Sequence, residues 1–588
     1  MALPLKKLVV SISFTSLMLS MSSVSFSAAQ TADAVSPEAS SGIIEKNLVE
    51  SDKFMVAAAN PLATQAGYDV LKAGGSAIDA LVAVQMMLGL VEPQSSGLGG
   101  GAFVVYYDAK SKQLTTFDGR ETAPIEATPE LFQDENGKPL KFYDAVVGGR
   151  SVGTPGTVKL MGSLHDKYGR LSWHQLLQPA LETARNGFPV SERLSSSIEG
   201  SKSRLSRYPE TRAYFFDSDG NALKEGRLLK NKAYADTLVT LATQGANAFY
   251  TGYIADDIVK KVRGIDDNPG VLSKTDFTSY TIKERAPTCL EYKEFDICGM
   301  GPPSSGALTV GQILGITSHF DLASMGAEST EAWQIIGDAS RLAFADRGRY
   351  MADTDFVPMP AGLLDADYLE SRAKLITPGT ALDSVSAGEP EWAQPIALAD
   401  DISIELPSTS HISIVDAEGN AVSVTTTIEN GFGSNVMSNG FLLNNELTDF
   451  SFKSHQDGYP IANRIEPGKR PRSSMSPTIV MKEGRPYLVV GSPGGSRIIG
   501  YVSKTLIAHM EWGMDIQSAI SLPNMLNRFG TYDLEKGTSA ESFEAPLTAM
   551  GFKVNVRDLN SGIQGILVQE GKLLGGADPR REGIVLGE

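Results

Sequence analysis

The sequence predicts an α+β fold, a layered sandwich with an antiparallel sheet core and helices outside the strands. Helix-like and strand-like segments come in long blocks, which argues against the regular strand–helix alternation of a parallel sheet. The strand-like runs at 411–416 and 421–428 are short, rich in β-branched residues and separated by a turn at 418–420.

The start of the chain has the three parts of an export signal. Lys6 and Lys7 are followed by a largely apolar run, 8–26, and by small residues at 27–29. This order is typical of a secretory signal peptide, residues 1–29, because serines dilute the apolar run too much for a membrane span. We therefore expect a periplasmic or secreted protein without a membrane anchor in its mature form.

Two helices open the part of the chain expected to be ordered, after a polar leader at 29–53. Asn60 as N-cap, Pro61 in the first turn and Gly74 beyond the end delimit the first helix. The second, from residue 76 to about residue 90, is apolar on nearly every side and is expected to be buried.

The middle of the chain divides into two kinds of segment. Residues 151–280 predict a mostly helical layer. Residues 373–407 are rich in Pro, Ser, Gly, Asp and Glu, which predicts an exposed and mobile segment suited to proteolytic processing. Strands prevail after it.

The chain has two cysteines, Cys289 and Cys298. If Lys293 and Glu294 form a two-residue turn, the cysteines face each other across a hairpin. An exported protein meets an oxidising compartment, so we expect a disulfide, with two half-buried free thiols as the alternative.

Charge and composition limit the partners. A formal net charge of −17 argues against binding to nucleic acid or to an anionic membrane, because such surfaces need excess Lys and Arg. The six histidines show no metal-ligand spacing, so we predict neither a metal site nor a cofactor. Small molecules or peptides are the expected partners.

The stretch 407–413, PSTSHIS, places hydroxyl groups at the start of a strand. Inside a chain the Thr409 hydroxyl has no base beside it. If the Ser408–Thr409 bond were cut, Thr409 would gain an α-amine with a pKa near neutrality, a general base for its own hydroxyl. The same hydroxyl could make the cut by attacking the Ser408 carbonyl. On the residues alone, an ordinary hydroxyl-rich surface is the alternative.

Four motifs resemble those of the γ-glutamyltransferases, self-processing members of the N-terminal-nucleophile hydrolase superfamily. They are FDGRETAP from Phe117, TSHISIVDAEGNAVSVTTTIENGFG from Thr409, KRPRSSMSPT from Lys469 and GSPGGSR from Gly491. The resemblance implies the αββα fold of that superfamily and a precursor that cleaves itself. A large subunit, residues 30–408, and a small subunit, residues 409–588 beginning with the catalytic threonine, would then form one αββα domain as a heterodimer.

The resemblance also implies a γ-glutamyl donor, usually glutathione, with water, amino acids or dipeptides as acceptors and a γ-glutamyl-threonine ester as the intermediate. By position, the donor's α-carboxylate would bind Arg120, Ser473 and Ser474, and its α-ammonium would bind Glu429, Glu446 and Asp449. The remaining matches are catalytic: Thr427 would orient the nucleophile, and the N–H groups of Gly494 and Gly495 would stabilise the oxyanion.

Some residues depart from the family pattern. Glu429 and Glu446 stand where several members carry amides, and acids there also occur in bacterial members related to glutaryl-cephalosporin acylases. A glutaryl group lacks the ammonium, so three acids favour a γ-glutamyl donor and leave the acylase as the alternative. Arg472 replaces a residue that is usually apolar. His411 is interpreted as a packing residue or an aid to self-processing.

A protein of another class would use a similar clamp. A periplasmic binding protein for acidic amino acids also needs Arg, Ser and carboxylate groups, but it needs neither Thr409 nor chain cleavage.

Overall fold

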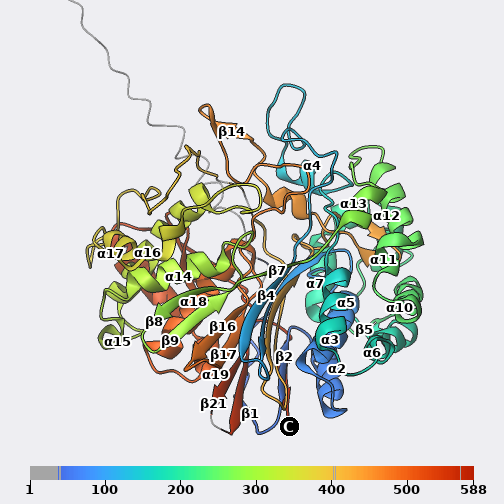
Figure 1. The fold of residues 1–588 in the computed structure, drawn as a ribbon, viewed down its shortest axis with the longest axis horizontal. Coiled ribbons are helices and arrows are strands. Elements are labelled where there is room, and N and C mark those ends of the chain that lie inside the picture. The colour runs from blue at the N-terminus through green and yellow to red at the C-terminus, as the bar shows by residue number, and fades with distance from the viewer. Residues whose placement is uncertain (1–37, 39–41, 402, 404, 570) are drawn as a thin grey trace, which may run out of the picture.

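Two stacked seven-stranded sheets form the centre of the protein (Figure 1). The computed structural model describes Glu38 and residues 42–401, 403, 405–569 and 571–588, so the expected signal peptide lies outside the described residues. In order, the first sheet contains β1 (Val49–Ser51), β22 (Lys572–Ala577), β21 (Gln564–Gln569), β17 (Arg485–Gly491), β16 (Thr478–Lys482), β9 (Phe295–Gly299) and β8 (Thr288–Tyr292). The second contains β23 (Ile584–Gly587), β2 (Met55–Ala58), β10 (Ser410–Val415), β11 (Ala421–Thr427), β3 (Gly101–Asp108), β4 (Gln113–Gly119) and β7 (Lys283–Arg285).

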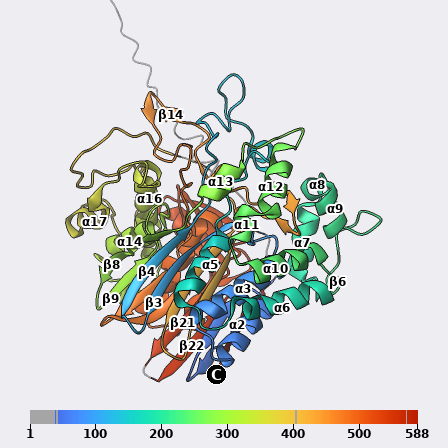
Figure 2. The same cartoon turned by 45° about the vertical axis from the view of Figure 1, so that its right-hand side comes forward.

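Helices cover the outer face of each sheet (Figure 2). The main helices on the second sheet are α2 (Pro61–Lys72), α3 (Ala77–Val91), α5 (Thr157–Tyr168), α6 (Trp173–Asn186) and α10 (Lys232–Gln244). Those on the first sheet are α14 (Gly306–Thr317), α16 (Thr330–Tyr350), α18 (Ile498–Met510) and α19 (Ile516–Ser521). No helix in the described ranges combines the length and the apolar character that crossing a membrane requires.

Three apolar clusters hold these four layers together. One joins the second sheet to its helices, another joins the first sheet to its own helices, and a third lies between the sheets. The third includes Met55 and Val415 of the second sheet and Val489 and Ile566 of the first. Since strand neighbours within both large sheets are antiparallel, the predicted αββα sandwich is confirmed.

Shorter elements complete the chain. The further helices are α4 (Phe142–Val146), α7 (Glu192–Gly200), α8 (Lys202–Leu205), α9 (Pro209–Phe215), α11 (Ala248–Thr251), α12 (Tyr253–Arg263), α13 (Lys274–Ser279), α15 (Leu322–Met325), α17 (Ala366–Ala373), α20 (Glu544–Ala549) and the 3-10 turns η1 (Ala361–Leu364), η2 (Glu446–Asp449), η3 (Gly495–Arg497) and η4 (Ser539–Phe543). The further strands are β5 (Phe188–Pro189), β6 (Leu228–Leu229), β12 (Met437–Ser438), β13 (Phe441–Leu442), β14 (His455–Gln456), β15 (Tyr459–Pro460), β18 (Met525–Asn527), β19 (Thr531–Glu535) and β20 (Lys553–Arg557).

The capping signals of the first two helices act as the sequence predicts. The Asn60 side chain accepts the Leu62 N–H at 3.0 Å, and Gly74 adopts φ 87° beyond the end of α2. Ser76 and Asp79 form a capping box at α3, whose residues are all buried. The helical character of residues 151–280 is also confirmed.

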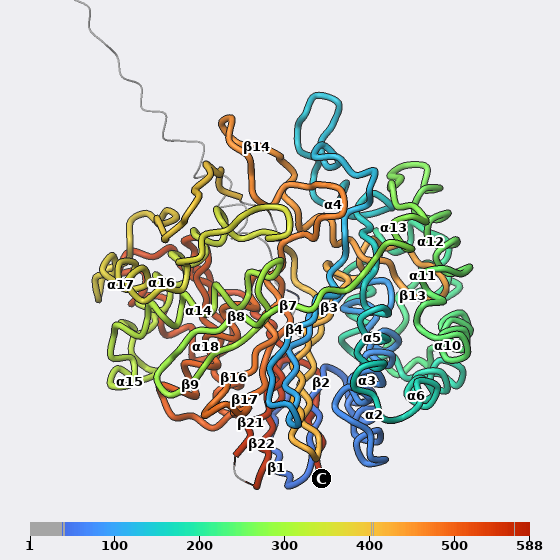
Figure 3. The backbone as a smooth tube through the Cα atoms, viewed as in Figure 1, coloured from blue at the N-terminus to red at the C-terminus, as the bar shows by residue number. Residues whose placement is uncertain are grey.

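Two expectations about irregular segments are wrong. The leader at 29–53 contains β1, a three-residue edge strand that is too short to show a period and is defined by pairing with β22 (Figure 3). The segment at 373–407 is not exposed at its end, where Asp401 and Glu405 are each 6% exposed. Both carboxylates are buried because they pair with buried arginines.

The strands on either side of the Ser408–Thr409 bond interleave. β10 and β11, which follow the bond, lie between β2 and β3, which precede it. The first sheet also combines strands from both parts of the chain. Cutting this one bond would therefore leave the two parts joined by both sheets and by their shared core.

The cysteines form the predicted hairpin bridge. β8 and β9 pair with Cys289 opposite Cys298, and their sulfur atoms are bonded at 2.06 Å. The turn consists of Lys293 and Glu294, as the spacing predicts.

Replacing both cysteines by serine tests the contribution of this bridge. We expect Cys289→Ser/Cys298→Ser to lower the free energy of unfolding by about 2–3 kcal/mol, because the short loop is no longer closed in the unfolded chain. Denaturant unfolding, with and without reductant, measures the difference. Equal midpoints for the oxidised and reduced parent chain would contradict it.

Candidate active site

Strand pairing places Thr409 opposite Thr427. Ser410, the first residue of β10, pairs with Thr426 near the end of β11, so the preceding threonine faces the last residue of β11. The Thr409 and Thr427 hydroxyl oxygens are 3.2 Å apart, and the Thr427 hydroxyl also accepts the Glu429 N–H at 2.9 Å. The Thr427 hydroxyl is therefore held beside that of Thr409, where the expected orienting role requires it.

The backbone around the Ser408–Thr409 bond is strained. Thr409 is 4% exposed and has φ 105°, a value that a β-branched residue rarely adopts. Cleavage would release this constraint, because a chain-terminal residue has no preceding carbonyl to fix φ. Relief of this strain would accompany a cut at this bond.

The glycine motif lies against the same bond. The Gly494 N–H donates to the Ser408 carbonyl oxygen at 3.2 Å. Gly494 and Gly495 have φ 137° and 58°, and a Cβ at Gly495 would lie 2.6 Å from the Leu406 oxygen. A backbone donor close to this carbonyl suits stabilisation of an oxyanion formed there.

Arg120 follows β4 and lies between two acids. Its guanidinium donates to the Asp449 carboxylate at 2.6 Å and to the Glu446 carboxylate. It also donates to the carbonyl oxygens of Pro471 and Arg472, at 3.2 and 2.9 Å. These bonds use four of the five guanidinium N–H groups. In the uncut chain Arg120 therefore cannot bind a substrate carboxylate in a bidentate manner.

Three buried acids lie close together. Glu446 and Asp449 belong to η2, and Glu429 follows β11 with φ 74°. Burial, with the neighbouring carboxylates, raises the pKa of Glu429 well above its ordinary value. Burial also raises the pKa values of Glu446 and Asp449, although Arg120 opposes the shift. A bound cation would relieve this excess of negative charge.

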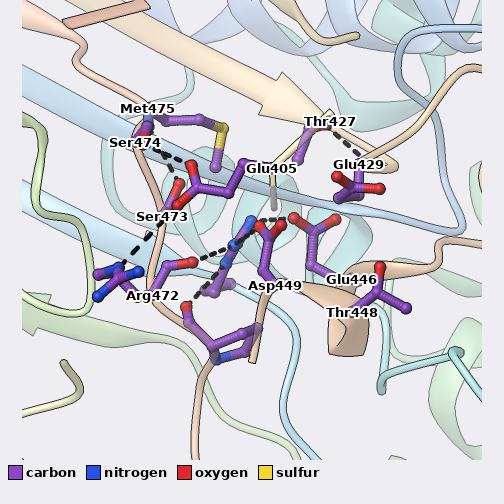
Figure 4. A network of polar contacts seen from close by, with 12 residues as sticks. Glu405, Thr427, Glu429, Glu446, Thr448, Asp449, Arg472, Ser473, Ser474 and Met475 are labelled. Carbon is purple, nitrogen blue, oxygen red and sulfur yellow. Dashed lines mark hydrogen bonds and ion pairs between the residues drawn. The ribbon is translucent and has the colours of Figure 1, made fainter. Parts of the chain in front are cut away.

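One pocket brings most of the predicted residues together (Figure 4). Its walls include the following predicted residues: Thr409, Thr427, Gly495, Arg120, Glu429, Glu446, Asp449, Ser473 and Ser474. Ser408 and Gly494 are not among the lining residues and lie next to the pocket at the scissile bond.

The pocket also contains residues that sequence reasoning missed. They are Glu405, Leu406, Met475 and Ile498. The Glu405 carboxylate accepts from the Ser474 hydroxyl at 2.5 Å and pairs with Arg347 of α16. Glu405 belongs to the segment expected to be mobile, and Arg347 is one of several basic residues in a long helix, so neither carried a signal in the sequence.

His411 is a packing residue of the sheet. Its ring nitrogens are hydrogen-bonded to the hydroxyl groups of Thr425, at 2.9 Å, and Ser413, at 3.1 Å. Burial lowers its pKa to about 3, so the ring is neutral at physiological pH. With both nitrogens engaged elsewhere, it is not placed to act as a base for Thr409.

Comparison with known proteins places these features in a family. The family model described as gamma-glutamyltranspeptidase matches residues 63–588. The chain belongs to this family. The glutathione hydrolase proenzyme of Bacillus subtilis (strain 168) is 39% identical over 547 residues, which cover 91% of both chains. That of Escherichia coli (strain K12) is 37% identical over 571 residues, 94% of this chain and 95% of the relative.

Acylases are also among the relatives of this gamma-glutamyltranspeptidase-family chain. The acylase ACY 1 proenzyme of Pseudomonas sp. (strain V22) is 32% identical and covers 87% of this chain and 88% of its own length. The cephalosporin acylase structure from Bacillus halodurans superposes with a TM-score of 0.82 at 26% identity, covering 94% of this chain and 99% of its own. The predicted family is thus confirmed, and acylase activity is the alternative to γ-glutamyl transfer within it.

The buried histidine predicts a pH dependence of stability. As pH falls below the ordinary His pKa of 6.5, the unfolded chain binds a proton that folded His411, with a pKa of about 3, does not. The contribution of His411 to the free energy of unfolding is therefore full above pH 6.5. It decreases as the pH falls towards 3, by up to about 1.4 kcal/mol per pH unit.

Denaturant unfolding of the Thr409→Ala chain at several pH values measures this slope. Adding His411→Gln should reduce it, whereas the exposed His174→Gln should not. An unchanged slope in the His411 variant would contradict the assignment.

Proposed function

We propose that the chain cuts itself between Ser408 and Thr409 and then hydrolyses or transfers γ-glutamyl groups, with glutathione as a donor. The observation that carries this proposal is the Thr409 hydroxyl in a pocket whose walls combine arginine, serine and carboxylate groups. Such a set matches the zwitterionic end of a γ-glutamyl donor and leaves its amide for the nucleophile.

Self-cleavage begins at the Thr409 hydroxyl. Its oxygen attacks the Ser408 carbonyl carbon, and the Gly494 N–H stabilises the negative charge on the carbonyl oxygen. The carbon–nitrogen bond breaks, the nitrogen takes the hydroxyl proton, and an ester joins the two parts. Water hydrolyses the ester to a carboxylate on Ser408 and a free hydroxyl on Thr409.

The new Thr409 amine then acts as the base for each turnover. It takes the hydroxyl proton as the oxygen attacks the γ-amide, and gives that proton to the leaving amine, cysteinylglycine when glutathione is the donor. The γ-glutamyl ester on Thr409 is resolved by water to give glutamate, or by an amino acid or dipeptide to give a new γ-glutamyl amide.

Donor recognition depends on charge. Ser473 and Ser474 bind the α-carboxylate, with Arg120 contributing the single guanidinium N–H that its acids and carbonyl partners leave free. Glu429, Glu446 and Asp449 bind the α-ammonium, whose positive charge offsets the repulsion that raises the pKa values of these acids. This excess of acid favours γ-glutamyl over glutaryl donors. Family membership leaves the binding-protein alternative without support.

The mature protein is a heterodimer of residues 30–408 and 409–588 that acts outside the cytoplasm. The interleaved strands support association of the two parts after the cut. The sequence of residues 1–29 supports export.

Thr409→Ala tests the nucleophile. We expect this variant to stay as one uncut and inactive chain, because it lacks the attacking oxygen. Electrophoresis and N-terminal sequencing of the parent should show a fragment that begins at Thr409. Normal cutting of the variant, or a parent fragment that begins elsewhere, would refute the assignment.

Glu429→Gln tests the ammonium site. We expect it to reduce the kcat/KM preference for a γ-glutamyl anilide over the matching glutaryl anilide by about tenfold, because one charged partner of the ammonium is lost. The exposed Glu483→Gln is the control and should keep the parent preference. A parent enzyme that prefers the glutaryl donor would favour the acylase instead.

A further inference from the structure

In the uncut chain, Glu405 fills one side of the pocket. Its carboxylate accepts from the Ser474 hydroxyl at 2.5 Å and forms an ion pair with Arg347. Figure 4 shows this carboxylate directed at Ser473 and Ser474. Asp449 and Glu446 lie beside each other, on the other side of the drawn residues from Ser474. Glu405 is only three residues before Ser408. The chain about to be cut therefore supplies an anion to the site expected to bind the donor's carboxylate.

Arg347 has supports that do not depend on Glu405. Its guanidinium donates to the Ser305 hydroxyl at 2.8 Å and to the Ser474 hydroxyl at 2.8 Å. The side chain is 3% exposed. These bonds hold the guanidinium beside Ser474 whether or not an acid is present, so the site is preorganised for a carboxylate.

The next residue contacts the other half of the donor site. The Leu406 N–H donates to the Glu429 carboxylate at 3.2 Å. Glu405 and Leu406 thus offer a carboxylate to Ser474 and Arg347 and an N–H donor to Glu429. A γ-glutamyl donor carries a carboxylate and an ammonium on one carbon, so the uncut segment presents the same two kinds of group to the pocket.

Cleavage changes the partners of only some arginines. The acids paired with Arg120, Glu446 and Asp449, lie after the cut and remain in the site. The acids paired with Arg347 and Arg472 are Glu405 and Asp401, which lie in the segment that ends at Ser408.

The electrostatics of Glu405 agree with this pairing. Although burial works in the opposite direction, Arg347 and Arg472 lower the pKa of Glu405 below its ordinary value, so it is an anion in the uncut chain. Burial and the neighbouring Arg472 in turn lower the pKa of Arg347. When the segment withdraws, two adjacent buried cations lose their anions. Such a site favours an incoming carboxylate.

We propose that Arg347 is a further donor-binding residue: in the processed enzyme it binds the donor's α-carboxylate together with Ser474, in the place that Glu405 occupies before cleavage. This inference rests on the proposed function. It explains why Arg120 can stay paired with two acids while the site still binds an anion. It also makes Glu405 the group that closes the site until the chain is cut.

The test measures the effect of Arg347→Met in a Glu405→Gln background. In this background the substitution removes the second charge of the pair and so leaves no unpaired buried ion. Two donors are used, a γ-glutamyl anilide and the same anilide with its α-carboxylate converted to an amide. We expect the Arg347 substitution to lower kcat/KM for the first donor by about tenfold, through KM, and to leave that for the second unchanged. Arg349→Met in the same background is the matched control, since Arg349 pairs with the exposed Asp400.

The outcomes are separable. Equal loss for both donors, or no loss for either, would overturn the role of Arg347 while leaving the proposed function intact. A parent enzyme without γ-glutamyl turnover would overturn the proposed function itself. If the double variant does not mature, a crystal structure of the processed parent with bound glutamate decides: a glutamate α-carboxylate that does not contact Arg347 overturns the inference.

Discussion

Backbone pairing of β10 with β2 on one side and β11 on the other is the constraint on which the site depends. From Ile412 to Val415 the strand is hydrogen-bonded on both edges, and Ser410 and His411 continue the ladder with β11, so the start of β10 cannot shift without breaking this pairing. This pairing places Thr409 opposite Thr427 and brings the Ser408 carbonyl to the glycine turn before α18. It also keeps the two parts of the chain together across the bond proposed to be cut.

A second constraint is charge in a buried pocket. Glu446 gives Arg120 a second acidic partner, and with Asp449 and two carbonyl oxygens it occupies four of the five guanidinium N–H groups. Arg472 pairs with Asp401, which precedes the bond proposed to be cut. Glu446 thus adds an anion beside Arg120, whereas Arg472 adds a cation beside the segment that ends at the bond proposed to be cut.

In the uncut chain, residues just before the Ser408–Thr409 bond serve as partners for polar groups of the donor site. Glu405 and Leu406 supply hydrogen-bond or ion-pair partners to Ser474, Arg347 and Glu429 in the precursor. Under the proposed mechanism, cutting exchanges these internal partners for those of a substrate. Maturation and substrate binding then use the same contacts, which links the closed precursor to the specificity of the enzyme.

Local patterns in the sequence determined much of the fold. Three features depend on neighbouring residues and were predicted from them: the caps of α2 and α3, the hairpin that pairs Cys289 with Cys298, and the strands β10 and β11 with the turn between them. The motifs also identified Thr409 and the residues around it. The tertiary structure alone decided what depends on long-range contacts. β1 exists because it pairs with β22, and Glu405 is buried because Arg347, from a distant helix, meets it. A charge pair between segments far apart leaves no periodic trace in either one, so its geometry could be read only from the folded chain.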